Sequence, residues 1–244
     1  MVSYLFVFIG GFVAGLYGSS VGSGGLVSLP TLILTGLPIH IAIATNRFAV
    51  FFLETIAAIR FRKEIKFNVP FGLLLGFLAA IGAYFGSKMI LNIEPELLNP
   101  IIAVVLILVF IFLLFNKKME EKETHQRKYY LLLLITTVPL LGIYGGSFGA
   151  GFGTFTMILL IAAGYSYIQS AALSRVIGSI MSLTAALTFA FHGVIDYKNG
   201  IVLAAGYSLG GWIGAGISVK KGSKYVRLLL FVVVVISALK LVTQ

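Results

Sequence analysis

Two arginines stand inside stretches of sequence that are otherwise apolar. Arg47 ends the segment ATNR, and Arg175 ends the segment ALSR 128 positions later. A guanidinium at the centre of a bilayer costs at least about 2.5–3.5 kcal/mol, so it needs a partner or a hydrated cavity. Because arginine is always charged and binds oxyanions through parallel N–H groups, two arginines that meet at one cavity predict a site for a small anion.

Glycine-rich segments accompany both arginines. YGSSVGSGG (17–25) and YGGSFGAGFG (144–153) each interrupt an apolar stretch. A break that is followed by a helix start presents unpaired backbone N–H groups and the positive end of a helix dipole, and both favour anions. The predicted substrate-binding residues combine these breaks with the polar neighbours of the arginines: Arg47, Arg175, Asn46, Ser174, Thr45, Ser20, Ser147, Gly22 and Gly149. Tyr17 and Tyr144, which open the two segments, either gate the cavity or only pack beside the break.

One acid, Glu54, lies in the same apolar stretch as Arg47. An acid buried in the membrane can couple transport to protons. The alternatives are an ion pair with Arg60 or Arg62 near the end of the stretch, or a structural tie to a buried arginine. A single carboxylate cannot neutralise two distant arginines, which favours anion binding as the role of the arginine pair.

The composition is that of a polytopic membrane protein. Of the 244 residues, 59% are hydrophobic and 11% are charged. The net charge of +10 comes mainly from short loops, a pattern of membrane topology rather than of nucleic-acid binding. There is no cysteine, the three histidines are scattered, and no nucleotide-binding or hydrolase motif occurs. We therefore expect no cofactor, no metal site and no enzymatic activity.

The apolar segments form two matching sets of five. Their approximate bounds are 3–17, 25–36, 39–60, 68–90, 97–115, 129–145, 153–164, 168–191, 199–219 and 225–243. Tyr17 and Gly22 fall on Tyr144 and Gly149 at an offset of 127, and Arg47 falls on Arg175 at 128. The predicted fold is an all-α membrane protein with repeats at 1–115 and 129–244, joined by a charged cytoplasmic linker at 116–128.

The basic residues predict the orientation. The loops 60–67, 116–128 and 220–227 hold thirteen of the 18 Lys and Arg residues, so they are assigned to the cytoplasm and both termini to the outside. The counterpart of loop 60–67, residues 192–199, then lies outside, which makes the two repeats inverted. The segment 25–36 reaches about 18 Å as a helix, short of a core about 30 Å thick. The glycine-broken pairs are therefore predicted to be re-entrant hairpins from opposite faces.

Several motifs resemble those of a known family. The segments LTGLPIHIAIATNR (34–47) and HGVIDY (192–197), together with the glycine-rich breaks, are similar to the TauE/SafE sulfite exporter family over almost the whole chain. The resemblance implies an inner-membrane permease that exports sulfite or small organosulfonates, with Thr45, Asn46 and Ser174 in characteristic helix starts. Ile39 departs from the pattern of the family, which commonly has a second proline directly after Pro38.

The pattern and the resemblance together predict a secondary transporter in the cytoplasmic membrane. Inverted repeats with broken helices are typical of alternating access around a site near the midplane. An anion channel and a membrane-embedded subunit that binds or delivers sulfur anions are the alternatives. The expected partners are a small anionic substrate such as sulfite or a sulfonate, and the lipid bilayer. Nucleic acid is not expected, and whether the chain forms a homodimer is left open.

Overall fold

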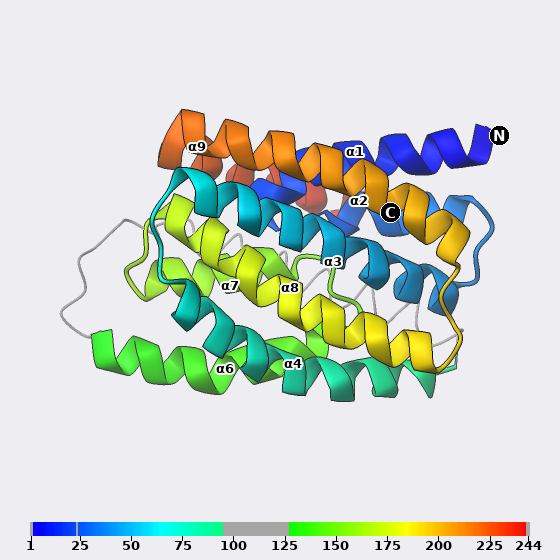
Figure 1. The fold of residues 1–244 in the computed structure, drawn as a ribbon, viewed down its shortest axis with the longest axis horizontal. Helices are drawn as coiled ribbons and strands as arrows, with labels where there is room; N and C mark the ends of the chain where they lie inside the picture. The colour runs from blue at the N-terminus through cyan, green and yellow to red at the C-terminus, as the bar shows by residue number, and fades with distance from the viewer. Residues whose placement is uncertain (1, 23, 95–126, 243–244) are drawn as a thin grey trace.

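The computed structural model describes residues 2–22, 24–94 and 127–242, and the regular secondary structure of this part of the chain is entirely helical (Figure 1). Its helices are α1 (Val2–Val21), α2 (Gly25–Leu34), α3 (Ile39–Glu64), α4 (Val69–Leu91), α6 (Arg127–Ser147), α7 (Phe152–Ala162), α8 (Tyr167–Phe191) and α9 (Tyr197–Val242). Five helices of the described part are long and apolar enough to cross a membrane. The predicted all-α membrane class is confirmed, whereas the predicted segment 97–115 and most of the linker lie outside the described residues.

Local sequence signals account for the helix starts. Pro38 directly precedes α3, where its fixed φ suits a helix entry. The Asn68 side chain accepts a hydrogen bond from the backbone N–H of Phe71 and caps α4. Ser166 and Gln169 form a reciprocal capping box at the start of α8. These signals fix the starting points of α3, α4 and α8.

Two helices extend further than the sequence predicted. α1 continues to Val21 and α6 to Ser147, through positions that had been assigned to the glycine-rich breaks. A non-helical backbone inside a bilayer leaves polar groups unpaired, so the helix continues for as long as the chain allows. Among the described residues, the breaks are thus confined to Gly22 and Gly24 in the first half and to residues 148–151 in the second.

The helices pack in a corresponding way in the two halves. α3 and α8 contact each other at the centre, α1 packs along α9, and α6 packs along α4. Glycines permit the close contacts, since a Cβ at Gly206 or Gly210 would overlap the backbone of α1 at Phe8 or Phe12. On the outer surface of α4, large apolar side chains are exposed, as expected for contact with lipid: Leu73, Leu74, Phe77, Ile81, Phe85 and Met89.

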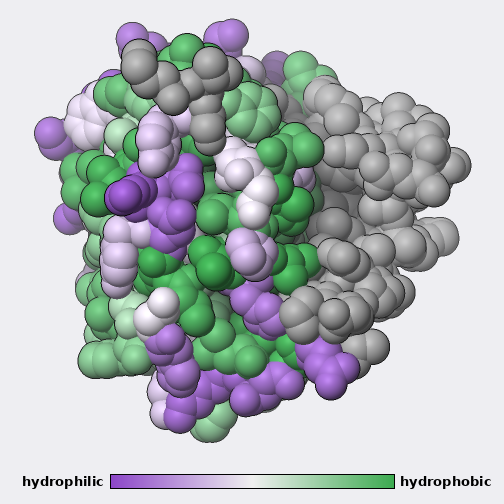
Figure 2. Space-filling model, turned by 90° about the vertical axis from the view of Figure 1, so that its right-hand side faces the viewer, coloured by the Kyte–Doolittle hydropathy of each residue, from purple (hydrophilic) through white to green (hydrophobic). Residues whose placement is uncertain are grey.

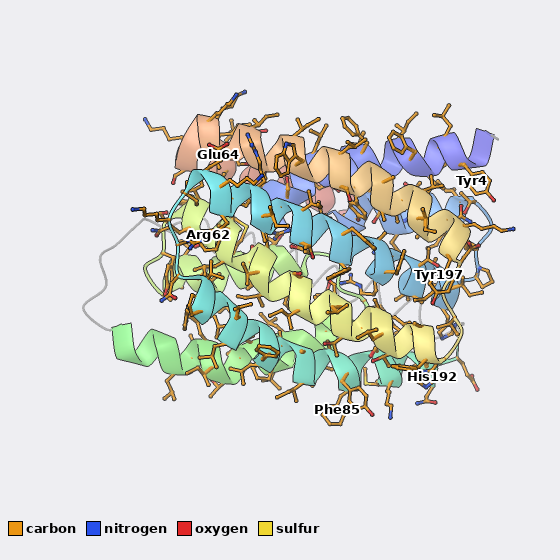
Figure 3. All side chains as sticks on the ribbon, in the orientation of Figure 1. Tyr4, Arg62, Glu64, Phe85, His192 and Tyr197 are labelled. Carbon is orange, nitrogen blue, oxygen red and sulfur yellow. The ribbon has the colours of Figure 1, made fainter. Side chains whose placement is uncertain are left out.

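The ends of the bundle differ in which turns they carry. In Figure 1 the N-terminus of α1, the turn 35–38 and the turn 192–196 lie at one end, and the turns 65–68 and 163–166 lie at the other. Figure 3 labels Tyr4, His192 and Tyr197 at the first end and Arg62 and Glu64 at the second. The first end, viewed directly in Figure 2, mixes hydrophilic and hydrophobic side chains. α2 therefore runs back towards the end at which α1 begins, and α7 runs back towards the end at which α6 begins.

The backbone of α9 leaves the helical conformation at Gly222, where φ is 73°. The part that follows Gly222, drawn in red in Figure 1, reverses direction behind the rest of the bundle. This kink separates the two segments that the sequence predicted at 199–219 and 225–243.

Candidate functional site

The two glycine-rich breaks meet at the centre of the bundle. Gly22 and Gly149 have φ values of 81° and 62°, a region that side chains other than glycine rarely adopt. A Cβ at Gly22 would overlap the backbone of Gly153, in the first turn of α7 directly after the other break. The Thr154 hydroxyl donates a 2.6 Å hydrogen bond to the carbonyl of Val21 and ties the breaks together. Glycine is needed here both for the backbone conformation and for the contact.

Arg47 reaches from α3 into the second break. Its side chain is buried, and Nη2 donates a 3.0 Å hydrogen bond to the carbonyl of Phe148. A Cβ at Gly149 would overlap the guanidinium, so the side chain lies directly on the break. Nε is buried without a hydrogen-bond partner among the described residues. No ion pair of Arg47 with an acid is found in that part of the chain.

Arg175 reaches from α8 towards the first break. Its Nη1 donates hydrogen bonds of 2.9 Å to the carbonyl of Gly18 and of 3.0 Å to Oε1 of Glu54. Nη2 donates a 3.0 Å hydrogen bond to the hydroxyl of Ser174. Each arginine thus bonds a carbonyl near the end of the first helix in the opposite half, but only Arg175 has an acidic partner in the described residues.

Glu54 pairs with neither Arg60 nor Arg62, the two partners considered for it near the end of α3, in the described residues. Arg60 pairs with Glu64 at 2.9 Å, one helical turn away, whereas one oxygen of the Glu54 carboxylate pairs in the interior with Arg175. Its second oxygen, Oε2, is buried without a hydrogen-bond partner in the described part of the chain. The structural tie therefore holds for Arg175, whereas the hydrogen-bond partner of Arg47 within the described residues is a neutral carbonyl.

A small cavity lies between the breaks, and Arg47 and Glu54 both line it. It has room for about one water molecule, less than a sulfur oxyanion needs. The helices α2 and α7 begin at the cavity with Gly25 and Phe152, so the positive ends of both helix dipoles face it. Its full lining is Gly22, Gly24, Gly25, Arg47, Val50, Leu53, Glu54, Gly149, Phe152, Gly153 and Met181. The charges and dipoles at this place favour a small anion.

Comparison with known proteins identifies the family of the chain. The family model described as "Sulfite exporter TauE/SafE" matches residues 7–241. The chain belongs to the TauE/SafE family. A "Probable membrane transporter protein ORF9" from Sinorhizobium sp is 26% identical over 98% of this chain and 92% of its own length. A "Probable membrane transporter protein" from Haemophilus influenzae is 27% identical over 91% and 87% of the two chains.

A further relative, "Probable membrane transporter protein YfcA" from Escherichia coli, is 25% identical over 94% of this chain and 86% of its own length. No solved structure matches. This TauE/SafE chain is thus a multi-pass membrane protein of a transporter family, and the names of its relatives are consistent with the absence of enzymatic activity.

The polar neighbours of the arginines in this TauE/SafE chain point in different directions. The side-chain oxygen of Asn46 accepts a 2.7 Å hydrogen bond from Ser28. Ser174 accepts from Arg175 and donates to the carbonyl of Ala171 at 2.9 Å. Thr45 accepts a 3.0 Å hydrogen bond from the backbone N–H of Asp196. Asn46 and Ser174 therefore lie beside the site, whereas Thr45 fixes the turn between α8 and α9.

The serines and tyrosines of the predicted breaks are inside helices. Ser20 hydrogen-bonds Ser218 of α9 at 2.5 Å, and Ser147 donates to the carbonyls of its own helix, α6. Neither serine lines the cavity. The Tyr144 hydroxyl donates to the carbonyl of Ala150 and so spans the second break, while Tyr17 packs against the central apolar cluster.

One polar network next to the site had no signal in the sequence. Tyr207 of α9 donates a 2.5 Å hydrogen bond to Ser28, which donates in turn to Asn46. The position equivalent to Tyr207 in the first half is Ala79, so the repeat does not reveal it. Serine and tyrosine in an apolar helix give no periodic pattern, and only the packing of α2, α3 and α9 brings the three residues together.

Proposed function

We propose that this protein is a secondary transporter that exports a small sulfur-containing oxyanion, sulfite or an organosulfonate, by alternating access. The observation that carries the proposal is the Arg47 guanidinium, which lies buried at a central cavity without an acidic partner in the described residues. A buried cation without a direct ion pair is unfavourable, so an anion that enters the cavity is attracted by the Arg47 guanidinium, although Glu54 on the same lining opposes part of that attraction.

The two arginines have different parts in the proposed site. Arg47 contacts the anion directly, together with the backbone N–H groups around Gly22 and Gly149. Arg175 contributes its charge from behind the cavity lining, since a Cβ at Gly153 would overlap its guanidinium. Asn46 and Ser174 hold the arginine-bearing segments of α3 and α8. The proposal thus keeps both arginines that the sequence predicted for the site, but only Arg47 contacts the anion.

Inverted repeats at 1–115 and 129–244, with the linker 116–128 in the cytoplasm, are part of the proposal. The helix packing supports the inverted repeats. α1 of the first half packs on α9 of the second half, and the corresponding helix α6 of the second half packs on α4 of the first half. The return of α2 and α7 to opposite ends supports re-entrant hairpins. Arg62 and the turn 65–68 lie at one end of the bundle, and the basic loop 60–67 thus supports the assignment of that end to the cytoplasm and of the termini to the outside.

The small size of the cavity favours a carrier over a channel. An oxyanion larger than the available space can enter only if the breaks separate, and such a change is the basis of alternating access. Tyr144, which bridges the second break, and Tyr17, at the corresponding position of the first half, are the proposed gates. Proton coupling at Glu54, which the sequence left open, would require the carboxylate to leave its ion pair with Arg175, so the proposal does not depend on it.

Purified protein in vesicles loaded with radioactive sulfite tests the proposal. We expect saturable efflux that accelerates when a potassium gradient with valinomycin makes the interior negative, because a negative charge gains about 2.3 kcal/mol per 100 mV. External unlabelled sulfite should speed the release of labelled sulfite, as a carrier predicts. Efflux equal to that of protein-free vesicles would contradict transport, and a large conductance without exchange would indicate a channel.

A further inference from the structure

The buried charges at the centre of the molecule do not cancel. Among the described residues, the buried charged side chains are Arg47, Arg175 and Glu54. The two positive charges and one negative charge sum to +1. Because buried charges are weakly screened, the net charge of the site determines the ligand charge that it binds most favourably.

The carboxylate that sets this sum breaks the repeat. The residue equivalent to Glu54 in the second half is Ser182, whose hydroxyl is buried without a hydrogen-bond partner in the described part of the chain. Serine at both positions would leave two uncompensated arginines and a charge of +2. The single acid is therefore the difference between a site for a doubly charged anion and a site for a singly charged one.

The position of Glu54 suits this role. Oε1 bonds Arg175 at 3.0 Å, and the residue also lines the cavity that Arg47 faces. A Cβ at Gly178 would lie 2.8 Å from the carboxyl carbon, so α8 packs directly against the carboxylate and limits its movement. An anion next to Arg47 therefore meets a fixed negative charge on the cavity wall, and a second negative charge on that anion is repelled.

We propose that ionised Glu54 is a specificity-determining residue that restricts the site to singly charged anions, such as sulfonates and hydrogen sulfite. The inference rests on the proposed anion transport and names the charge class of its substrate. It makes Glu54 a fixed counter-ion of Arg175 during transport, and it differs from proton coupling because Glu54 stays ionised when the anion is bound.

Methanesulfonate and sulfate are suitable probes, because both are tetrahedral at sulfur and of similar size but carry one and two negative charges at neutral pH. Competition of each with labelled sulfite, in vesicles and in detergent, gives a preference ratio for every variant. We expect the native protein to prefer methanesulfonate and the Glu54→Gln variant to shift the ratio towards sulfate by at least about tenfold. Glu54→Asp should keep the native preference.

Glu64→Gln is the matched control, since it removes the same charge from the exposed end of the same helix. Its ratio should remain native. A native protein that accepts sulfate as readily as methanesulfonate overturns the inference without affecting the proposed function, and so does an unchanged ratio in folded Glu54→Gln. If Glu54→Gln does not fold, the preference ratios of the native protein and of Glu54→Asp still test the inference, since both must favour methanesulfonate over sulfate. If labelled sulfite is neither bound nor transported and methanesulfonate does not bind either, the proposed function itself is contradicted.

Discussion

Replacing Arg47 with alanine should reduce sulfite or sulfonate transport at least about 30-fold. The guanidinium is the charged donor that faces the cavity, and the loss of a buried charged contact costs about 2–5 kcal/mol. The fold should persist, because the hydrogen bond that the structure gives Arg47 goes to a backbone carbonyl and its removal leaves no buried acid unpaired among the described residues. Initial rates of uptake into vesicles, and anion binding in detergent, measure the effect.

Two variants of the same helix serve as controls for Arg47→Ala. Arg47→Lys keeps the charge but loses the planar pair of donors, so it should recover only part of the activity. Arg62→Ala removes a positive charge from the exposed end of α3 and should transport at the native rate. Native rates in folded Arg47→Ala would remove this residue from the site.

Replacing Arg175 with alanine should abolish transport and also destabilise the protein by about 3–5 kcal/mol. The substitution leaves the Glu54 carboxylate buried and unpaired, and it removes the hydrogen bonds to Gly18 and Ser174. Thermal unfolding of the purified protein in detergent measures the loss of stability. The buried ion pair with Glu54 is the reason to expect a loss of stability as well as a loss of transport.

A double substitution separates charge pairing from other effects at Arg175. Arg175→Gln combined with Glu54→Gln removes both charges, so no unpaired ion remains in the interior. We expect the double variant to recover most of the lost thermal stability, since neutral replacement of a buried pair is far less costly than removal of one member. An unchanged unfolding temperature in Arg175→Ala, or a double variant no more stable than the single one, would show that the pair is not important for stability.

The helices and the central arginines could be predicted because they leave local signals. Apolar length predicted α3, α4 and α8 to within a few residues, and Pro38 and Gly222 mark boundaries that the sequence predicted. The lower hydropathy of the breaks suggested that α1 and α6 end early. In the structure both helices continue, because backbone hydrogen bonding inside a membrane outweighs the low helix propensity of glycine and serine.

The partners of the buried polar groups could not be predicted, since they depend on contacts between distant segments. Glu54 and Arg175 are 121 positions apart, and no period in the sequence connects them. Thr45 and Ser20 belong to the right segments, but the rotation of their helices directs them to Asp196 and Ser218. A repeat indicates which residues correspond, whereas only the packing shows which of them meet.

The location of a bound anion tests the proposed site most directly. Crystals of the protein grown with bromoethanesulfonate, a singly charged anion whose bromine gives an anomalous signal, would reveal its position. We predict a bromine peak between the two breaks, with the sulfonate oxygens within hydrogen-bond distance of the Arg47 guanidinium and of the backbone N–H groups that open α2 and α7. A saturated crystal in which the anion binds only at the basic surface loops, while Arg47 stays on the Phe148 carbonyl, would contradict it.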